Sequence, residues 1–389
     1  MLNVEFTVNG VVRKISIDGH ALTSNWRPRI VGFDAPTLAI PNNYGGFAKP
    51  EFGSISFNPL LFYDTAESIN DYPPPIAGAI SVYYTDTTEL ARELVFTGLA
   101  HLKSFDRTSV NYALYGPSYD ETIIIRGVGP LAVGQIYEIT EYIADDDFTN
   151  VGAASNATGV IFTASGTTPT TWTNFSKLAP RWNDTLNNVI TNLLTRIPEI
   201  TTVDTTYARA SSPNVLYTLT SERLIINVAS DIAAFYSHLF YVIGSTAYLV
   251  DLKRNNGTDW DLTEFKFFKE PQYQYNTPIA QITCSSDSVV YSAYSSYPYG
   301  TTTSVEAYHE TQANIEACLD DILAIENAPR ISFDVPMIAG NFPKLGQKIT
   351  IPDTAHVANL ASWIRVRKLQ YDFINDRINI EGEGGIAAA

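Results

Sequence analysis

The first seventeen residues alternate apolar and polar side chains, and this period of two leaves little choice of fold for the start of the chain. Two alternating runs, residues 2–8 and 11–17, flank Asn9 and Gly10. An Asn-Gly pair between such runs is typical of a two-residue type I′ turn, because both central residues of that turn have positive φ. The sequence therefore predicts that the chain begins with a β-hairpin.

Extended runs continue through the first third of the chain. They cover residues 29–33, 54–57, 80–85, 95–100 and 109–115. Loops rich in Pro and Asn separate them, and residues 86–94 fit a short helix. We predict that residues 1–130 form one β-rich N-terminal domain.

The composition of the 389-residue chain agrees with a folded, strand-rich protein. Hydrophobic residues make up 45% and charged residues 17% of the sequence, which is ordinary for a globular chain. Tyr and Phe are abundant and only 2 Met are present, which favours strands over helices. The net charge of −16 argues against nonspecific binding to duplex DNA, since that binding needs clustered Lys and Arg. An acidic surface instead suits a path along which DNA slides without sticking.

Residues 131–179 differ in composition from the sequence on either side. They are rich in Thr, Ala, Gly and Asn, and carry five carboxylates against one cation, Lys177. An extended run, residues 122–126, precedes them, and a helical pattern over residues 182–197 follows. We predict an inserted β-module on the outside of the molecule, whose two ends lie close together. Five aromatic residues are expected to form its core: Tyr137, Tyr142, Phe148, Phe162 and Trp172.

The remainder of the chain divides into a mixed α+β region, a final β-domain and a short tail. Residues 180–329 contain two helical patterns, one capped by residues 183–185 and the other over 304–325. Strands are predicted at residues 217–220, 224–228, 240–243, 247–252, 265–268 and 279–285. Residues 330–384 again read as strands and include a hairpin around Asn375 and Asp376. Residues 385–389 are predicted to be a flexible tail.

Motifs for catalysis or cofactor binding are missing from the sequence. The five His residues are far apart, and no phosphate-binding loop or nucleophile elbow is present. Asp145, Asp146 and Asp147 with Asn150 could hold a hard cation, but an acidic loop in water is the simpler interpretation. Cys284 and Cys318 are expected to be free thiols. Residues 232–250 lack formal charge, but polar residues and a glycine interrupt them, which argues against a membrane span. We expect no cofactor, no metal and no enzymatic activity.

Two groups of residues are candidates for contacts between subunits. Arg365 and Arg367 belong to the densest basic cluster of the chain and would share one face of a strand. They could dock an acidic neighbouring subunit, although a solvated strand face is the alternative. An aromatic run could either bury its rings at a subunit contact or form a platform for a sugar, and the contact is favoured. This run contains Tyr291, Tyr294, Tyr297 and Tyr299.

Several motifs of the chain resemble those of the tail hub proteins, or baseplate hubs, of long-tailed phages. In the N-terminal part they are residues 29–31 (RIV), 50–55 (PEFGSI), 72–75 (YPPP) and 95–100 (VFTGLA). In the C-terminal part they are residues 343–349 (PKLGQKI), 363–372 (WIRVRKLQYD) and 378–384 (INIEGEG). The inserted segment resembles a small β-module that recurs in phage virion proteins, through residues 146–152 (DDFTNVG) and 156–172.

The resemblance implies a fold that is mainly β with α+β parts: two tube-type β-barrel domains, smaller mixed domains and the inserted module. It implies a structural protein of the virion, made in the host cytoplasm, and not an enzyme. Such a hub forms a homotrimeric ring that closes the tail tube, lines the DNA path and joins the tube or distal tail protein to a central spike or fibre. DNA would pass without specific binding. The alternatives are a distal tail or nozzle-type ring component, or a carbohydrate-binding protein that recognises the host.

Overall fold

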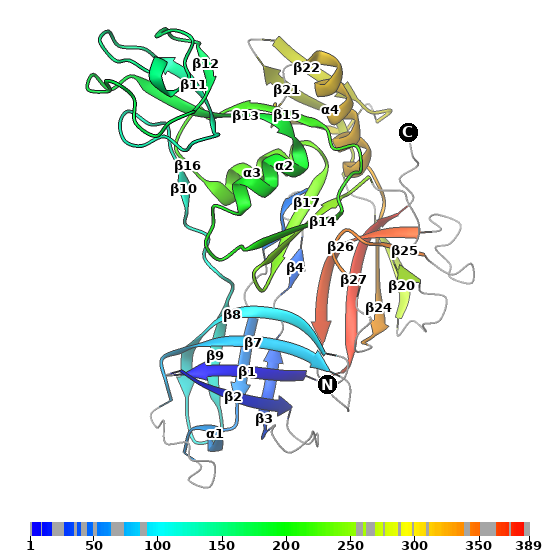
Figure 1. Ribbon diagram of the computed structural model, residues 1–389. Helices are drawn as coiled ribbons and strands as arrows, with labels where there is room; N and C mark the ends of the chain where they lie inside the picture. Colours follow the sequence, from blue (N-terminus) through cyan, green and yellow to red (C-terminus); the bar gives the residue numbers. More distant parts are fainter. Residues whose placement is uncertain are drawn as a thin grey trace.

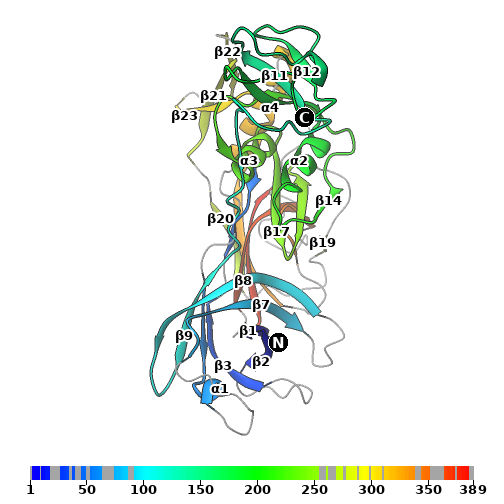
Figure 2. The ribbon, with the colours of Figure 1, turned by 60° about the vertical axis from the view of Figure 1, so that its left-hand side comes forward.

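The computed structural model shows an elongated chain dominated by strands. The predicted class, mainly β with α+β parts, is confirmed. Figures 1 and 2 show a β-barrel at one end, and the helices and the inserted module at the other. The structure describes residues 2–8, 10–17, 27–34, 37–39, 45–49, 53–63, 74–85, 92–253, 260–261, 269–274, 277–286, 289–297, 299–308, 311–337, 343–350, 363–372 and 375–384.

Seven N-terminal strands close into a barrel in the order β1-β2-β3-β6-β9-β8-β7. They are β1 (Leu2–Val8), β2 (Val11–Ile17), β3 (Arg27–Asp34), β6 (Gly53–Phe57), β7 (Ala77–Thr85), β8 (Arg92–Phe105) and β9 (Val110–Tyr115), with a short helix α1 (Leu60–Tyr63) after β6. The predicted first hairpin is present, and Gly10 has the positive φ that its turn requires. Aromatic rings fill the interior, where Phe6 and Phe57 both pack against Tyr112.

A second large sheet comes mainly from the C-terminal part of the chain. Its order is β19-β25-β26-β27-β24-β20, and β4 pairs with β26 beside this path. The strands are β19 (Trp260–Asp261), β25 (Lys348–Thr350), β26 (Trp363–Asp372), β27 (Arg377–Gly384), β24 (Arg330–Pro336), β20 (Lys269–Gln274) and β4 (Leu38–Ala39). Over the described residues this sheet is an open path. Strands from the predicted mixed region, β19 and β20, therefore join strands of the predicted final domain.

Most of the helices belong to the region beside the inserted module (Figure 1). A four-stranded sheet in the order β14-β18-β17-β5 lies beside α2 and α3 (Figure 1). Its strands are β14 (Thr202–Tyr207), β18 (Thr246–Asp251), β17 (His238–Ile243) and β5 (Gly46–Phe47), and the helices are α2 (Leu186–Leu194) and α3 (Ile225–Phe235). A second layer packs α4 (Gln312–Glu326) on the sheet of β21 (Ile279–Ser286), β22 (Val289–Tyr294) and β23 (Thr301–Glu306). A two-stranded pair, β10 (Thr122–Ile123) and β16 (Arg223–Leu224), leads into this region.

The inserted segment forms a small sheet with a core of its own. Its order is β12-β11-β13-β15, from β12 (Ile161–Thr163), β11 (Ile136–Glu141), β13 (Lys177–Thr185) and β15 (Asn214–Thr218), with a 3-10 turn η2 (Thr149–Val151). All five aromatic residues predicted for the module core belong to one cluster, with Tyr142 and Trp172 at its margin. β13 runs across the predicted boundary at residue 179 and pairs on both sides, so the module shares a strand with the region that follows.

Several predicted elements were wrong in type or extent. The predicted strand over 224–228 is the start of α3, where Ile225, Val228 and Ile232 are buried at helical spacing. A short apolar run fits either structure, and only its neighbours decide between them. Trp182 belongs to β13, so the helix begins at Leu186. Ser304 lies in β23, and α4 begins only at Gln312.

Two further predicted elements fall partly or wholly outside the described residues. The end of the predicted helix over 86–94 is strand β8, which begins at Arg92, and residues 86–91 lie outside them. The predicted strand over 265–268 and the predicted tail over 385–389 lie outside as well.

The barrel and the second large sheet share one continuous apolar core. Buried residues from β1 to β9 belong to the same cluster as buried residues of β17, β18, β24, β26 and β27. At the border, the Tyr84 hydroxyl of the barrel donates a hydrogen bond to the Asp376 carboxylate, 3.0 Å away in the β26–β27 turn. The two β units are therefore fixed to each other by packing as well as by chain connection.

The turn at Gly346 packs against Val250 of β18, which belongs to the same apolar core. Gly346 has φ +74°, and a Cβ there would lie 2.4 Å from Cγ1 of Val250. We expect Gly346→Ala to lower the free energy of unfolding by about 2 kcal/mol or more, because it adds overpacking to backbone strain. Gly10 has nearly the same φ, +78°, and nothing within 4 Å of its Cβ position. Gly10→Ala is the control and should cost only about 1 kcal/mol in urea unfolding. Equal losses for both variants would show that the turn is not tightly packed.

Candidate interaction surfaces

Arg365 and Arg367 lie inside the fold. Their exposed fractions are 1% and 5%. β26 has a bulge between Val366 and Lys368, and the four consecutive residues 364–367 are all buried. Arg365 donates to the carbonyl oxygen of Gly346, and Arg367 pairs with Glu383. Neither guanidinium is exposed to dock a neighbouring subunit.

Glu383 is the acidic partner of this cluster and belongs to the same chain. Its side chain is fully buried, and it also accepts a hydrogen bond from Arg330 Nη1 at 2.7 Å. Burial lowers the pKa of Arg367, although the nearby Glu383 carboxylate opposes that shift. A buried charge without its partner is strongly destabilising. The cluster thus fixes the register of β24, β26 and β27.

The predicted tyrosine run is an exposed surface. Tyr294, Tyr297 and Tyr299 are 71%, 47% and 97% exposed, at the end of β22 and in the loop that follows. Val289 and Val290 at the start of β22 are exposed too. Tyr291 differs, because it is half-buried against the core of the helical region. We call Tyr294, Tyr297 and Tyr299 the tyrosine loop.

The two ends of the inserted module lie side by side. Arg126 and Leu178 form an antiparallel bridge with two backbone hydrogen bonds of 2.9 and 2.8 Å. Inside β13, Arg181 marks the change of partner: β11 pairs up to it, and β15 pairs from it onward. The Arg181 guanidinium donates to the Glu138 carboxylate at 3.0 Å, so an ion pair ties β11 to this shared strand.

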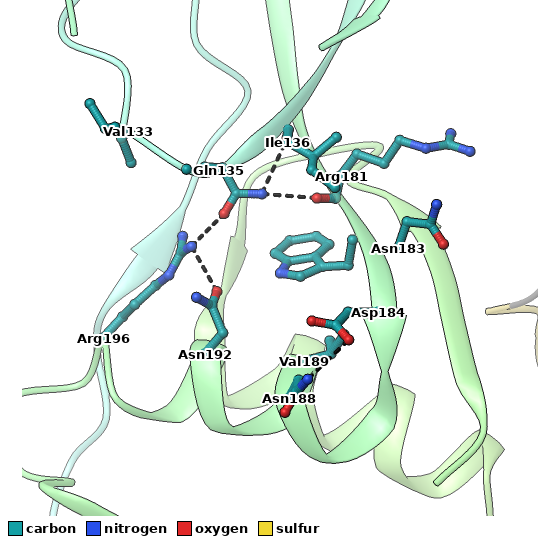
Figure 3. Close-up of a pocket in the computed structure, with 13 residues that line it drawn as sticks. Val133, Gln135, Ile136, Arg181, Asn183, Asp184, Asn188, Val189, Asn192 and Arg196 are labelled. Atoms are coloured by element: carbon teal, nitrogen blue, oxygen red, sulfur yellow. Dashed lines mark hydrogen bonds between the residues drawn. The ribbon is translucent and has the colours of Figure 1, made fainter. Parts of the chain in front are cut away.

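A polar pocket of about 400 Å³ opens where the module meets α2 (Figure 3). The amide of Gln135, from the module, donates to the carbonyl oxygens of Ile136 and Arg181 at 2.9 Å. Its oxygen accepts from Arg196, which also donates to Asn192 on α2 at 2.8 Å. Gln135 is only 8% exposed, so its own hydrogen bonds are largely shielded from water, whereas the bond between Arg196 and Asn192 is exposed. The network clamps the module to the helix.

The acidic run of the module organises its loops. Asp146 is 1% exposed, and its carboxylate accepts backbone hydrogen bonds from Thr173, Asn174 and Ser176. Burial alone would raise the pKa of Asp146, but these hydrogen bonds lower it below its ordinary value. Hydrogen bonds from Asn156 and Thr149 hold the pKa of Asp147 at about 2. Both carboxylates are therefore structural acceptors, and the interpretation as a simple solvated loop is wrong for Asp146.

Side chains suited to catalysis or metal binding do not cluster in the part of the chain that the structure describes. No cluster of His, Cys, Asp and Glu there could hold a metal ion. Cys284 and Cys318 are free, as predicted, and burial raises their pKa values to about 11 and about 12, so both stay protonated at neutral pH. Among the described helices, none is long and apolar enough to span a membrane.

The fold of this chain is similar to that of a phage tail protein with a solved structure. The 43 kDa tail protein of prophage MuSo2 from Shewanella oneidensis aligns over 98% of this chain and 98% of its own, with a TM-score of 0.51 and 11% identity. A tail protein from Neisseria meningitidis MC58 aligns over 98% and 96%, with a TM-score of 0.49 and 8% identity. At 11% identity the first likeness establishes a shared fold. The sequence matches no protein-family model and no curated protein.

Asp146 should be the most sensitive carboxylate of the module. We expect Asp146→Asn to destabilise the module by about 1–3 kcal/mol, because the new NH₂ group replaces an oxygen that accepts from a backbone N–H. Hydrogen-exchange mass spectrometry of peptides covering residues 171–176 would report the loss of protection. Asp145→Asn is the matched control, since Asp145 is exposed and Asn tolerates its φ of +74°. Equal protection in the two variants would contradict the structural role of Asp146.

The module should also respond to acid. A carboxyl group with a lowered folded pKa contributes stability above its unfolded pKa, and that stability is lost as pH falls through the folded value. For Asp147 this window runs from 3.8 down to about 2. We expect the NMR signals of Asp147 and Asn156 in the folded protein to titrate with a midpoint of about 2, and Asp147→Asn to abolish the change. Titration at the ordinary Asp value would count against the hydrogen bonds seen here.

Proposed function

We propose that this chain is the hub protein of a phage tail, a structural virion protein whose ring closes the tail tube and joins it to a distal spike or fibre. One observation carries the proposal: a closed seven-stranded barrel and a second large sheet occur in one chain and share one core. A ring of three subunits, each with two β units, would present six β units and so match a tube of sixfold symmetry. The shared fold with a phage tail protein supports this reading.

Two β units in each chain and six positions in the tube lead us to propose a homotrimeric ring. Three chains would present six β units to the tube or distal tail protein, and a closed ring avoids unpaired surfaces. The net charge of −16 supports a DNA path without specific binding, because carboxylates repel phosphates. We propose the tyrosine loop as a contact with a neighbouring subunit, since exposed rings supply large contact areas at interfaces.

The inserted module is proposed to brace a neighbouring protein in the particle. Its separate core and the clamp between Gln135, Arg196 and Asn192 support a rigid attachment. We keep the boundaries 1–130, 131–179, 180–329 and 330–384 as a proposal for the domains. β13 and β20 both cross from one of these segments to a sheet in another.

Two alternatives to the hub predict different experimental results. A distal tail or nozzle-type ring would contain six copies of the chain. A carbohydrate-binding protein would use the tyrosine loop as a stacking platform, which its exposure favours. Binding of the purified chain to host cells, lost on replacement of Tyr297 and Tyr299 by Ala, would support the second alternative.

Copy number in the assembled particle tests the hub proposal. We expect cryo-electron microscopy of virions to show three copies of this chain in one ring, at the end of the tube, with both β units of each chain facing the sixfold tube. The reason is that two β units per subunit make threefold and sixfold symmetry compatible. Six copies in one ring would replace the hub by the nozzle-type component, and a position away from the tail axis would exclude both.

A further inference from the structure

The polar pocket between the inserted module and α2 has the position and the size of a ligand site. Its volume is about 400 Å³, and its wall combines residues 132–136 of the module, residues 181–184 of β13 and side chains in and just after α2 (Figure 3). Small-molecule sites typically measure about 300–1,000 Å³ and occur preferentially where two structural units meet. Neither the proposed ring nor the tyrosine loop uses this cavity.

The wall of the pocket is held in place by contacts within the chain. Trp182 is 4% exposed and stacks on Tyr217, with ring centroids 5.8 Å apart. Gln135 accepts a hydrogen bond from Arg196, whose guanidinium also donates to Asn192 at 2.8 Å. A preorganised wall lowers the entropic cost of binding, because fewer side chains have to be ordered by the ligand.

Three asparagine amides on the wall have hydrogen-bonding groups to spare. Within the described part of the chain, the side chain of Asn183 makes no hydrogen bond. Asn192 uses only its oxygen, for Arg196, and Asn188 uses only its NH₂ group, for Asp184, among the residues described. An amide has both donors and an acceptor. The pocket therefore offers donors from Asn183 and Asn192, and acceptors from Asn183 and Asn188.

This lining favours a ligand rich in hydroxyl groups. A polar group that is buried without a partner costs free energy, so an apolar ligand would bind poorly here. A hydroxyl both donates and accepts, and can therefore pair with either half of an amide. Val133 and Ile136 also line the pocket and add apolar surface for the C–H groups of a ring. A saccharide combines many hydroxyls with such C–H groups.

Charges of both signs lie around the pocket, which argues against a simple ion as its ligand. Arg181 on the wall is paired with Glu138 at 3.0 Å, and Asp184 adds a carboxylate to the wall. Burial lowers the pKa of Arg196, and the positive charge of Arg126 lowers it further. An anion would meet Asp184 and a cation would meet Arg196, whereas a neutral saccharide is repelled by neither.

We propose that this pocket binds a saccharide, whose hydroxyl groups form hydrogen bonds with the amides of Asn183, Asn188 and Asn192. The inference goes beyond the hub role and does not rest on it, because the pocket is complete within one chain. It also differs from the stacking platform considered for the tyrosine loop, since it uses amides in a cavity and not exposed rings.

Saturation-transfer difference NMR on the purified full-length chain tests the pocket. The probes are D-glucose, D-galactose and N-acetyl-D-glucosamine, each added separately. We expect at least one probe to bind with a dissociation constant on the order of 1 mM, which is ordinary for so small a ligand. The indole N–H signal of Trp182 should shift with the same probe, because Trp182 lines the pocket. Absence of binding for all three probes would overturn the proposal.

A pair of asparagine variants locates the bound probe. Asn183→Ala removes an exposed amide of the wall and should weaken binding by about three- to tenfold, the effect of losing one hydrogen bond. Asn214→Ala is the matched control, since Asn214 is an exposed residue of the neighbouring strand β15 and does not line the pocket. The control should bind as the unchanged chain does. Equal affinities of the two variants would reject the pocket as the site.

A third variant separates the pocket from the tyrosine loop. Tyr299 is 97% exposed, and a saccharide that stacks on this loop would be released by Tyr299→Ala. We expect this variant to bind the probe with unchanged affinity. Binding that is lost in Tyr299→Ala and kept in Asn183→Ala would assign the saccharide to the tyrosine loop and overturn the inference. Neither result changes the copy number on which the hub proposal depends.

Discussion

The arrangement of the molecule depends on the pairing of β5 with β17. Between β3 and β6 the chain leaves the barrel, adds β4 to the second large sheet, and inserts β5 beside β17. Gly45 makes this approach feasible, since a Cβ there would lie 2.2 Å from the carbonyl oxygen of His238. Phe47 then stacks on Phe240, with ring centroids 5.1 Å apart. The connection between β3 and β6 thereby adds one strand to the second large sheet and one to the sheet of β14, β18 and β17.

These contacts connect the barrel and the other sheets into one frame, to which the inserted module is attached. The barrel and the second sheet share an apolar core, and the buried Glu383 with its two arginines keeps the second sheet in register. The module has its own core but takes its attachment from β13, which continues into the helical region. The tyrosine loop stays exposed in this frame.

Prediction from the sequence succeeded where the signal was local. The first hairpin follows from the alternation around Gly10, and the module core follows from aromatic residues within fifty positions of one another. It failed where local patterns are ambiguous. An apolar run such as Ile225–Phe235 fits a strand or a buried helix, and its packing against β5 and β17 favours the helix. The exposed tyrosines were identified from their Ser, Pro and Gly neighbours, although Tyr291 turned inward.

The sequence by itself determined the class of the fold, the first hairpin and the aromatic core within residues 137–172, because these depend on composition and on spacing along the chain. The tertiary structure alone decided which charged and apolar side chains are exposed. Arg365 and Arg367 look like a surface cluster in the sequence, yet Gly346 and Glu383 enclose them. Thr7 and Ala79, about seventy residues apart in the sequence, are paired directly in the barrel. Strand register creates such neighbours, and register is set by contacts distant in sequence.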